Sequence, residues 1–482
     1  MSTFIPTIGL EVHAQLSTET KLFCRCKNQF GQKPNHSTCP VCLGMPGALP
    51  TLNQRAIEFA TRAGLALGCD IQITSVFSRK NYFYPDLPKG YQISQYDKPI
   101  CLGGGLDTEL GRVRLTRIHV EEDAGKLLHG DSKANQSEGS LVDLNRAGVP
   151  LIEIVSEPDI SSPEQAVAYL KKLRTILRYI GVCDGNMEEG SLRCDANVSV
   201  RPEGETKLRT RAEIKNINSF RFVQKAIEFE IARQTEIYKQ GGEVLQETRL
   251  FNTDKMATFS MRSKEEANDY RYFPEPDLQP LVLSQAFIAD ISASMPELPD
   301  GRKQRYMQTY QLSEYDAGVI TAEKEISDFF EASIERYQTD DIKKIKKLTN
   351  TLSSEVLRIV KETNTPIDRI QISPADLAET MKLIDAGTIS GKIAKELLDK
   401  IAQTGLAPMQ IIEKEGWKQE SDPDALKKIA QAIIDANPEQ KQQYLAGKDK
   451  LFGFFVGQVM KETKGQANPS LINEILKELL QH

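Results

Sequence analysis

The segment Leu192-Arg-Cys-Asp-Ala-Asn-Val-Ser-Val200 alternates apolar and polar residues along its whole length. Such alternation is typical of a β-strand with one buried face and one polar face. A second such segment, Leu208–Ile217, follows the turn-like sequence Pro202-Glu-Gly-Glu205, so the two segments predict a β-hairpin. Ile8–Leu16 alternates in the same way. We therefore expect the N-terminal part of the chain to be rich in β-strands.

The rest of the chain has a helical pattern. It follows a break at Met295-Pro-Glu-Leu-Pro-Asp-Gly301, which has two prolines and a glycine in seven residues. Beyond this break apolar residues recur at helical spacing, for example Ile389, Ile393, Leu397 and Ile401. A second linker is expected near residue 404, followed by a bundle of short helices. The pattern predicts an α+β fold with three domains: β-rich residues 1–294, helical residues 295–404 and a small helical tail, 405–482.

The charge of the whole chain argues against a general nucleic-acid-binding protein. Its 482 residues include 61 Lys and Arg against 67 Asp and Glu, a net charge of −6. Residues 341–482, however, hold 21 basic and 20 acidic residues, so this part is nearly neutral. Within it, we expect the lysines of Gly447–Asn468 to contact phosphates and the phenylalanines to form core. The sequence has no apolar run long enough for a membrane span, and we expect a cytoplasmic protein.

Four of the eight cysteines lie close together in the sequence. Cys24 and Cys26 form one pair, and Cys39 and Cys42 form a second pair after twelve intervening residues. Two close thiolate pairs are typical of a tetrahedral Zn²⁺ site in a reducing compartment, and four sulfur ligands leave no open position for catalysis. We therefore predict a structural zinc site. Four unrelated free cysteines are the alternative.

A second group of candidate ligands consists of three carboxylates and a histidine. Glu11 and His13 are two residues apart on a predicted strand, so their side chains share a face. Glu122 follows a strand-like run, and Glu153 interrupts an apolar stretch in which an unpaired charge would be costly. Together these residues would suit Mg²⁺, which prefers oxygen ligands. Ion pairs with nearby arginines are the alternative.

The predicted hairpin carries charged residues on one face. In its first arm, Arg193, Asp195 and Asn197 alternate with apolar residues. In its second arm, one face carries the side chains of Arg209, Arg211, Glu213 and Lys215. A face with both cations and carboxylates suits the binding of phosphates together with a metal. A solvent-exposed face with surface salt bridges is the alternative.

Several motifs spread along the chain resemble one family. They are Ile8-Gly-Leu-Glu-Val-His13, Arg79-Lys-Asn-Tyr-Phe-Tyr-Pro-Asp86, His119-Val-Glu-Glu-Asp-Ala-Gly-Lys126, Glu188-Glu-Gly-Ser-Leu-Arg-Cys-Asp-Ala-Asn197, Tyr270-Arg-Tyr-Phe-Pro-Glu-Pro276 and Gly465-Gln-Ala-Asn-Pro469. In these motifs the chain resembles the B subunits of bacterial tRNA-dependent amidotransferases. The resemblance implies a catalytic cradle domain, a helical domain and a YqeY-like tail that contacts tRNA.

The resemblance also implies an enzyme that is active as part of a heteromeric complex. Its substrates would be misacylated Asp-tRNA(Asn) and Glu-tRNA(Gln), whose side-chain carboxylate would be phosphorylated by ATP and then attacked by ammonia. An amidase (A) subunit would release that ammonia from glutamine, and a small C subunit would join the other two. The family's Mg²⁺ site matches the positions of Glu11, His13, Glu122 and Glu153.

Further roles follow from the charge pattern and the proposed chemistry. Phosphoryl transfer requires cations around the phosphate oxygens, for which the candidates are Lys80, Arg193, Arg211 and Lys215. Asp195 and Glu213 are candidates for holding a second metal or guiding the amine. Two other functions stay open: an ATP-dependent kinase or amide ligase acting on a small molecule, and a non-catalytic, zinc-containing RNA-binding scaffold.

Overall fold

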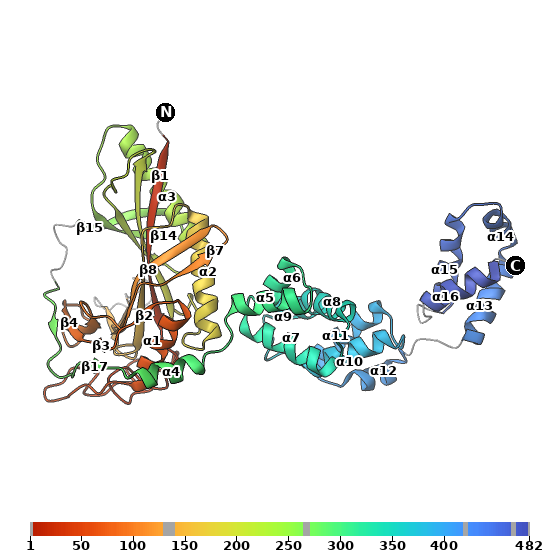
Figure 1. The fold of residues 1–482 in the computed structure, drawn as a ribbon, viewed down its shortest axis with the longest axis horizontal. Coiled ribbons are helices and arrows are strands. Elements are labelled where there is room, and N and C mark those ends of the chain that lie inside the picture. The colour runs from red at the N-terminus through yellow and green to blue at the C-terminus, as the bar shows by residue number, and fades with distance from the viewer. Residues whose placement is uncertain (1–2, 129–139, 264–269, 418–422, 464–468, 481–482) are drawn as a thin grey trace. The chain divides into compact units, whose positions relative to one another are not determined.

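The computed structural model describes residues 3–128, 140–263, 270–417, 423–463 and 469–480. It divides into two compact units, Met1–Leu298 and Pro299–His482. The first unit is rich in β-strands, whereas the described part of the second contains helices (Figure 1). The predicted α+β fold class is confirmed, and the further division near residue 404 stays a prediction. Within the described residues, no helix is both long and apolar enough to cross a membrane.

One large sheet organises the first unit. Its strands are β1 (Phe4–Gln15), β2 (Asp70–Ile71), β6 (Cys101–Leu102), β7 (Gly105–Thr108), β8 (Gly111–Glu122), β11 (Pro150–Ser156), β12 (Leu192–Pro202), β13 (Ala212–Ile217), β14 (Glu247–Asn252) and β15 (Ala257–Ser263). They lie in the order β15-β14-β13-β12-β1-β11-β8-β6-β2, and β7 also pairs with β8. The pairing of β13 with β14 is parallel, whereas β1 pairs antiparallel with both β11 and β12.

The register of the central strands brings the polar residues together. His13 lies opposite Glu153 on one side and opposite Arg193 on the other, and Glu11 lies opposite Asp195. Because directly paired residues point to the same face, these side chains share one face of the sheet. The predicted hairpin forms from β12 and β13, but its second arm begins later than expected, at Ala212.

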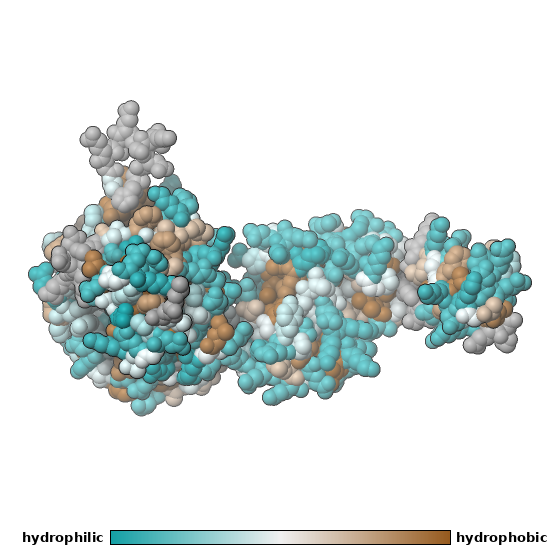
Figure 2. Space-filling view, turned by 90° about the horizontal axis from the view of Figure 1, so that it is seen from above, coloured by the Kyte–Doolittle hydropathy of each residue, from teal (hydrophilic) through white to brown (hydrophobic). Residues whose placement is uncertain are grey.

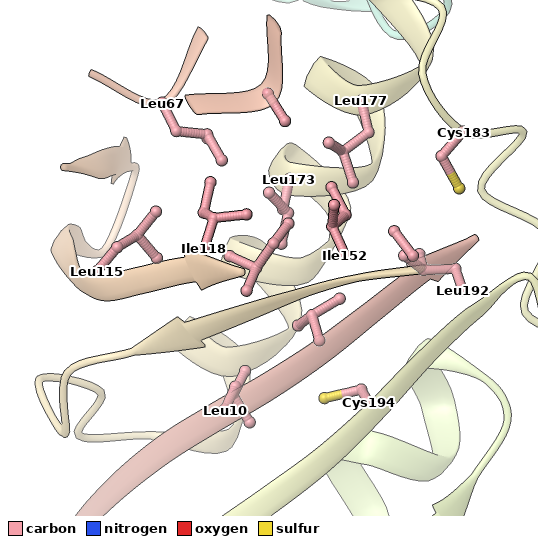
Figure 3. Packing of buried hydrophobic residues seen from close by; sticks show 14 of the residues in the cluster. Leu10, Leu67, Leu115, Ile118, Ile152, Leu173, Leu177, Cys183, Leu192 and Cys194 are labelled. Carbon is pink, nitrogen blue, oxygen red and sulfur yellow. The ribbon is translucent and has the colours of Figure 1, made fainter. Parts of the chain in front are cut away.

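The opposite face of the sheet is apolar and is covered by helices. α2 (Pro163–Tyr179) and α3 (Phe220–Lys239) pack in this core, together with α1 (Gln54–Ala66). Figure 3 shows Leu173 and Leu177 of α2 above Ile118 and Ile152 of the sheet. Burying one such side chain contributes about 1.5–3 kcal/mol, so this face anchors the strands that carry the polar residues.

Three short sheets border the large one. They pair β9 (Lys126–Leu128) with β10 (Leu141–Asp143), β4 (Phe77–Asn81) with β5 (Tyr91–Gln95) and β16 (Phe273–Pro274), and β3 (Thr74–Ser75) with β17 (Leu281–Val282). The β4–β5 pair lies next to β8, because side-chain and backbone groups of β5 bond to the end of β8. The first unit ends with α4 (Gln285–Ala293).

The second unit has two hydrophobic clusters. Its helices are α5 (Pro299–Thr309), α6 (Glu314–Ile320), α7 (Lys324–Tyr337), α8 (Ile342–Thr351), the π-helical turn η2 (Leu352–Val356), α9 (Leu357–Thr363), α10 (Pro374–Asp385), α11 (Gly391–Thr404), α12 (Pro408–Glu415), α13 (Pro423–Ala436), α14 (Pro438–Leu445), α15 (Lys450–Glu462) and α16 (Pro469–Leu480). The predicted stripe from Ile389, just before α11, to Ile401 is buried in the first cluster, and Phe455 is buried in the second. Lys464 and the motif residues 465–468 lie outside the described residues. On the face in Figure 2, hydrophilic residues predominate and hydrophobic ones form small patches.

Candidate active site

The polar face of the large sheet gathers two imidazoles and two carboxylates. His13 Nε2 lies 3.3 Å from Glu153 Oε2 and 3.9 Å from Glu121 Oε1. His119 Nε2 lies 3.5 Å from Glu153 Oε2 and 3.7 Å from Glu121 Oε2. Both carboxylates are buried, with exposed fractions of 2% for Glu121 and 7% for Glu153. We call His13, His119, Glu121 and Glu153 the histidine–carboxylate cluster.

Mutual electrostatics favour the charged forms of Glu121, Glu153 and His13. Burial alone would raise the pKa of Glu153, but the neighbouring His119 and His13 outweigh it and hold the pKa below its usual value. Burial and the negative charge of Glu153 raise the pKa of Glu121. The charge of Lys80 and the contact with His119 outweigh them, so the net pKa of Glu121 is lowered. For His13, burial lowers the pKa, but the interactions with Glu153 and Glu121 raise it by more than burial lowers it, so the net shift is upward. Two buried anions therefore face one small space.

Glu122, which the sequence pattern suggested as a metal ligand, lies apart from this cluster. Its carboxylate accepts hydrogen bonds from Lys89 Nζ and, at 2.9 Å, from the backbone N–H of Ile93. Glu121 instead faces the histidines, and its Oε2 accepts a 3.0 Å bond from Ser94 Oγ. Consecutive strand residues point to opposite faces, so only one of the two glutamates can line the polar face. In the structure Glu121, and not Glu122, lies with His13 and Glu153, and the ligand role of either glutamate stays a prediction.

Glu11 and four hairpin residues extend the polar face on the side of β12 and β13. Glu11 Oε1 accepts a 2.9 Å hydrogen bond from Asn197 Nδ2. Burial and the charge of Glu153 raise the pKa of Glu11. Lys215 Nζ lies 2.6 Å from Asp195 Oδ2 and 2.9 Å from Glu213 Oε1. These predicted site residues therefore lie together, beside the histidine–carboxylate cluster.

A cavity of about 220 Å³ opens next to Glu11. Glu11, Asn197, Ser199 and Arg211 are among the residues that line it. Arg211 precedes β13 and is nevertheless among the residues that line this cavity. The cavity thus combines a carboxylate, a guanidinium and neutral hydrogen-bonding groups, which is a suitable lining for a phosphorylated ligand.

Arg193 is engaged in a separate buried network. Its NH2 group lies 2.6 Å from Asp123 Oδ2, which also accepts a 2.8 Å hydrogen bond from Gln15 Nε2. Arg146 Nε lies 3.6 Å from the same carboxylate oxygen. Gln15, Arg146 and Lys126 are among the residues that line a second cavity, of about 320 Å³. Arg193 therefore pairs with Asp123 in the structure, and its predicted contact with a phosphate stays a prediction.

Sequence reasoning missed Asp123, His119 and Glu121 as members of the site. They occupy every second position, 119, 121 and 123, along the end of β8 and the residue that follows it. That alternation was a usable signal, because it places the three on one face of a strand. The predicted Lys80 does lie near the cluster, since its charge lowers the pKa values of Glu121 and Glu153.

The four cysteines predicted to bind zinc converge in space. The sulfur atoms of Cys24, Cys26, Cys39 and Cys42 all lie within 4.8 Å of one another. A hydrogen bond from Cys24, supported by the Cys39 amide and the Lys21 charge, lowers the pKa of Cys42 to about 4. Burial and a hydrogen bond with Cys39 raise the pKa of Cys26 to about 11. The arrangement fits a tetrahedral four-sulfur site.

Comparison with known proteins identifies the family. A model described as the GatB/GatE catalytic domain matches residues 6–289, and one described as the GatB domain matches residues 328–480. The B subunit of the aspartyl/glutamyl-tRNA(Asn/Gln) amidotransferase from Persephonella marina is 53% identical over 481 residues, 99% of each chain. The B subunit from Geobacter sulfurreducens is 55% identical over 477 residues, 98% of each chain. The chain belongs to this B-subunit family. The family assigned from the motifs is confirmed, and the B-subunit match includes both units of the chain.

Proposed function

We propose that this protein converts misacylated Asp-tRNA(Asn), Glu-tRNA(Gln) or both into the correctly amidated tRNAs. A carboxylate resists ammonia because oxide is a very poor leaving group. Transfer of the ATP γ-phosphoryl group to the side-chain carboxylate forms an acyl phosphate, and attack by ammonia then releases phosphate and leaves the amide. Family membership and the buried histidine–carboxylate cluster together support this proposal.

The donor set of the cluster fits a divalent cation. His13, Glu121 and Glu153 offer ligand atoms within 4.8 Å of one another, and the two carboxylates have lowered pKa values. A bound Mg²⁺ would partly neutralise the charge of the phosphate oxygens during phosphoryl transfer. Glu11, whose side chain interacts electrostatically with Glu153, stays a candidate for a further ligand. The four cysteines suit a structural Zn²⁺ that holds their loop.

Cationic side chains around the cluster have distinct proposed roles. Arg211 lines the cavity beside Glu11, where it can bind phosphate oxygens. Lys80 lies near Glu121 and Glu153 and can hold the substrate carboxylate or a phosphate beside them. Arg193 positions Asp123. The pair of Lys215 with Asp195 and Glu213 can guide ammonia or a second cation to the polar face.

The proposed partners follow from the family to which the chain belongs. The relatives are named as one lettered subunit of an amidotransferase, so each belongs to a larger assembly. For this chain we infer an amidase (A) subunit that delivers ammonia and a small C subunit that joins the two. Use of the amidated tRNAs in translation is consistent with a cytoplasmic location.

The proposal is tested by purifying the full-length chain with its co-expressed partners and assaying amide formation on both misacylated tRNAs. We expect Asn-tRNA or Gln-tRNA to form only when ATP and an ammonia source are both present. The matched variant Glu153→Gln should abolish this activity while the complex stays intact by native mass spectrometry. Amidation of a free amino acid would favour a small-molecule ligase, and tRNA binding without amidation would favour a scaffold.

A further inference from the structure

Five tyrosines form a continuous aromatic surface beside the polar face. The rings of Tyr96 and Tyr272 are stacked, with centroids 4.1 Å apart and planes at 4°. Tyr270 lies 6.0 Å from Tyr272, Tyr82 lies 5.9 Å from Tyr270, and Tyr84 lies 6.2 Å from Tyr82. They come from the loop after β4, the residue after β5 and the segment before β16. We call these five residues the tyrosine wall.

Tyr84 and Tyr96 of the wall are unusually exposed for aromatic residues, whereas Tyr82, Tyr270 and Tyr272 are half-buried. The exposed fractions are 55% for Tyr96 and 50% for Tyr84, and the adjacent Phe83 is 82% exposed. Exposed aromatic area is unfavourable in water, and contiguous patches of it mark binding surfaces. Aromatic side chains beside cationic ones are a typical surface for stacking the bases of single-stranded nucleic acid.

The backbone that carries the wall is strained. Arg271, between Tyr270 and Tyr272, has a φ of 46°, a conformation that residues with side chains rarely adopt. Asn81 holds this turn, because its Nδ2 donates to the carbonyl groups of Tyr270 at 3.1 Å and Arg271 at 2.9 Å. Strained backbone that its surroundings hold in place is concentrated at binding and catalytic sites.

The wall borders the histidine–carboxylate cluster through Lys80. Lys80 Nζ lies 5.1 Å from the centre of the Tyr270 ring, and its charge acts on Glu121 and Glu153. Tyr82 Oη donates a 3.0 Å hydrogen bond to Gln92 Oε1, and Gln92 Nε2 donates to the carbonyl of Glu122 at the end of β8. A base stacked on this wall would therefore lie next to the proposed site of phosphoryl transfer.

We propose that the tyrosine wall stacks the 3′-terminal adenine of the misacylated tRNA. This inference rests on the proposed function. The amino acid is esterified to the ribose of that terminal nucleotide, so a side-chain carboxylate at the cluster places the terminal base only one ribose and one aminoacyl group away. The adenine of ATP is separated from its γ-phosphoryl group by a ribose and two further phosphates. An aromatic surface that borders the cluster thus fits the tRNA end better than it fits ATP.

The test uses misacylated tRNA with 2-aminopurine in place of the 3′-terminal adenine, bound to the complete complex. Stacking quenches 2-aminopurine fluorescence, so the wild-type complex should quench it. Tyr96→Ala should remove the quenching and raise KM for the misacylated tRNA roughly 10- to 100-fold, with KM for ATP unchanged. Tyr96→Phe should retain both properties, because its ring still stacks. Tyr315→Ala, at a 78% exposed tyrosine in α6, is the control and should behave as wild type.

Three results would overturn the inference. One is a wild-type complex that amidates unmodified tRNA but leaves the terminal 2-aminopurine fully fluorescent. Another is quenching of 2-aminopurine riboside triphosphate that Tyr96→Ala removes, which would assign the wall to ATP. The third is Tyr96→Ala with wild-type quenching and KM. A wild-type complex that forms no amide at all would instead refute the proposed function, so the two failures are distinguishable.

Discussion

Glu121 and Glu122 are consecutive residues with different surroundings, so loss of their charges has different consequences. Glu121→Gln removes one of the anions that face His13 and His119. We expect the affinity for Mn²⁺, used as a spectroscopic probe of the divalent site, to fall by more than about 10-fold, because loss of even an outer partner of a metal site costs about that much. Electron paramagnetic resonance of free Mn²⁺ measures this change.

Glu122→Gln is the matched control for that measurement. It leaves the buried Lys89 without its carboxylate partner, so we expect a lower free energy of unfolding and nearly unchanged Mn²⁺ affinity. Loss of Mn²⁺ binding in Glu122→Gln, together with retention in Glu121→Gln, would show that Glu122 is the ligand and that the histidine–carboxylate cluster is not the metal site.

We expect Asp385 to make a pH-dependent contribution to the stability of the second unit. Partial burial raises its pKa, but hydrogen bonds from Tyr337 and Lys344 outweigh this, so the net pKa lies below the usual 3.8. A carboxyl with a lowered folded-state pKa stabilises the fold above its unfolded pKa, and this contribution is lost as pH falls through the folded value. Asp385→Asn should therefore speed amide exchange in α7 and α10 at pH 7, and the difference from wild type should shrink below pH 3.8.

Hydrogen-exchange mass spectrometry, corrected for the intrinsic exchange rate at each pH, gives this comparison. Asp368→Asn, at an exposed loop position, is the control and should match wild type throughout. An Asp385→Asn effect that is equally large at pH 7 and well below pH 3.8 would contradict the assigned ionisation.

At the scale of single residues, the sequence predicted part of the candidate site. Glu11, His13 and Glu153 could be chosen from their places on strands, because strand alternation and an ionisable residue in an apolar run are both visible in one dimension. The choice between Glu121 and Glu122 depends on which face of β8 turns toward β1 and β11. That information comes from strand pairing, which the sequence does not display.

At the scale of elements, the cysteine loop is expected to depend on its metal. Cys24→Ser removes one of four sulfur ligands, so we expect loss of stoichiometric zinc and faster amide exchange in residues 24–42. Elemental analysis of the purified protein and hydrogen exchange measure the two effects. Cys69→Ala, at a buried cysteine in the main core, should keep its zinc. Wild-type protein purified without zinc and with an equally protected loop would refute a structural zinc site.

Helix α3 carries a buried carboxylate that joins it to the edge of the sheet. Glu230 is fully buried and bonds to Arg233, Gln234 and Thr258, with Arg249 Nε 3.4 Å away. Glu230→Ala removes the buried carboxylate that these arginines share and leaves them only Glu247, and we expect a loss of about 3–5 kcal/mol in the free energy of unfolding. Urea denaturation followed by circular dichroism provides the value.

A surface pair on the same helix provides the comparison. Glu228 bonds to the exposed Lys225, so Glu228→Ala should cost only about 0–1 kcal/mol. Equal costs for Glu228→Ala and Glu230→Ala would mean that the buried network contributes nothing beyond a surface ion pair.

Element boundaries were predictable where the local chemistry is strong. Ser162 caps α2 and Pro163 occupies its first turn, and both residue types are typical of these positions in a helix. The start of β13 was not predictable from the sequence, because residues 208–211 continue the alternation of the strand without pairing in the sheet. Alternation reports which side chains share a face, but it does not report where a neighbouring strand ends.

For the whole molecule, the two units divide the proposed work. The sheet unit contains the histidine–carboxylate cluster, the cysteine site and the tyrosine wall, and the helical unit has its own hydrophobic clusters. The net charge of −6 for the whole chain is a poor guide to nucleic-acid binding, since it averages residues 1–340, with a net charge of −7, and residues 341–482, with a net charge of +1.

The most direct test of the account measures phosphate released from γ-labelled ATP by the complete complex, with and without misacylated tRNA. We predict release that requires Asp-tRNA(Asn) or Glu-tRNA(Gln), equals the amide formed when ammonia is supplied, and is lost in Glu153→Gln. Phosphate release that is independent of tRNA, or amide formation without ATP, would contradict the claim that this polar sheet face activates the aminoacyl carboxylate by phosphorylation.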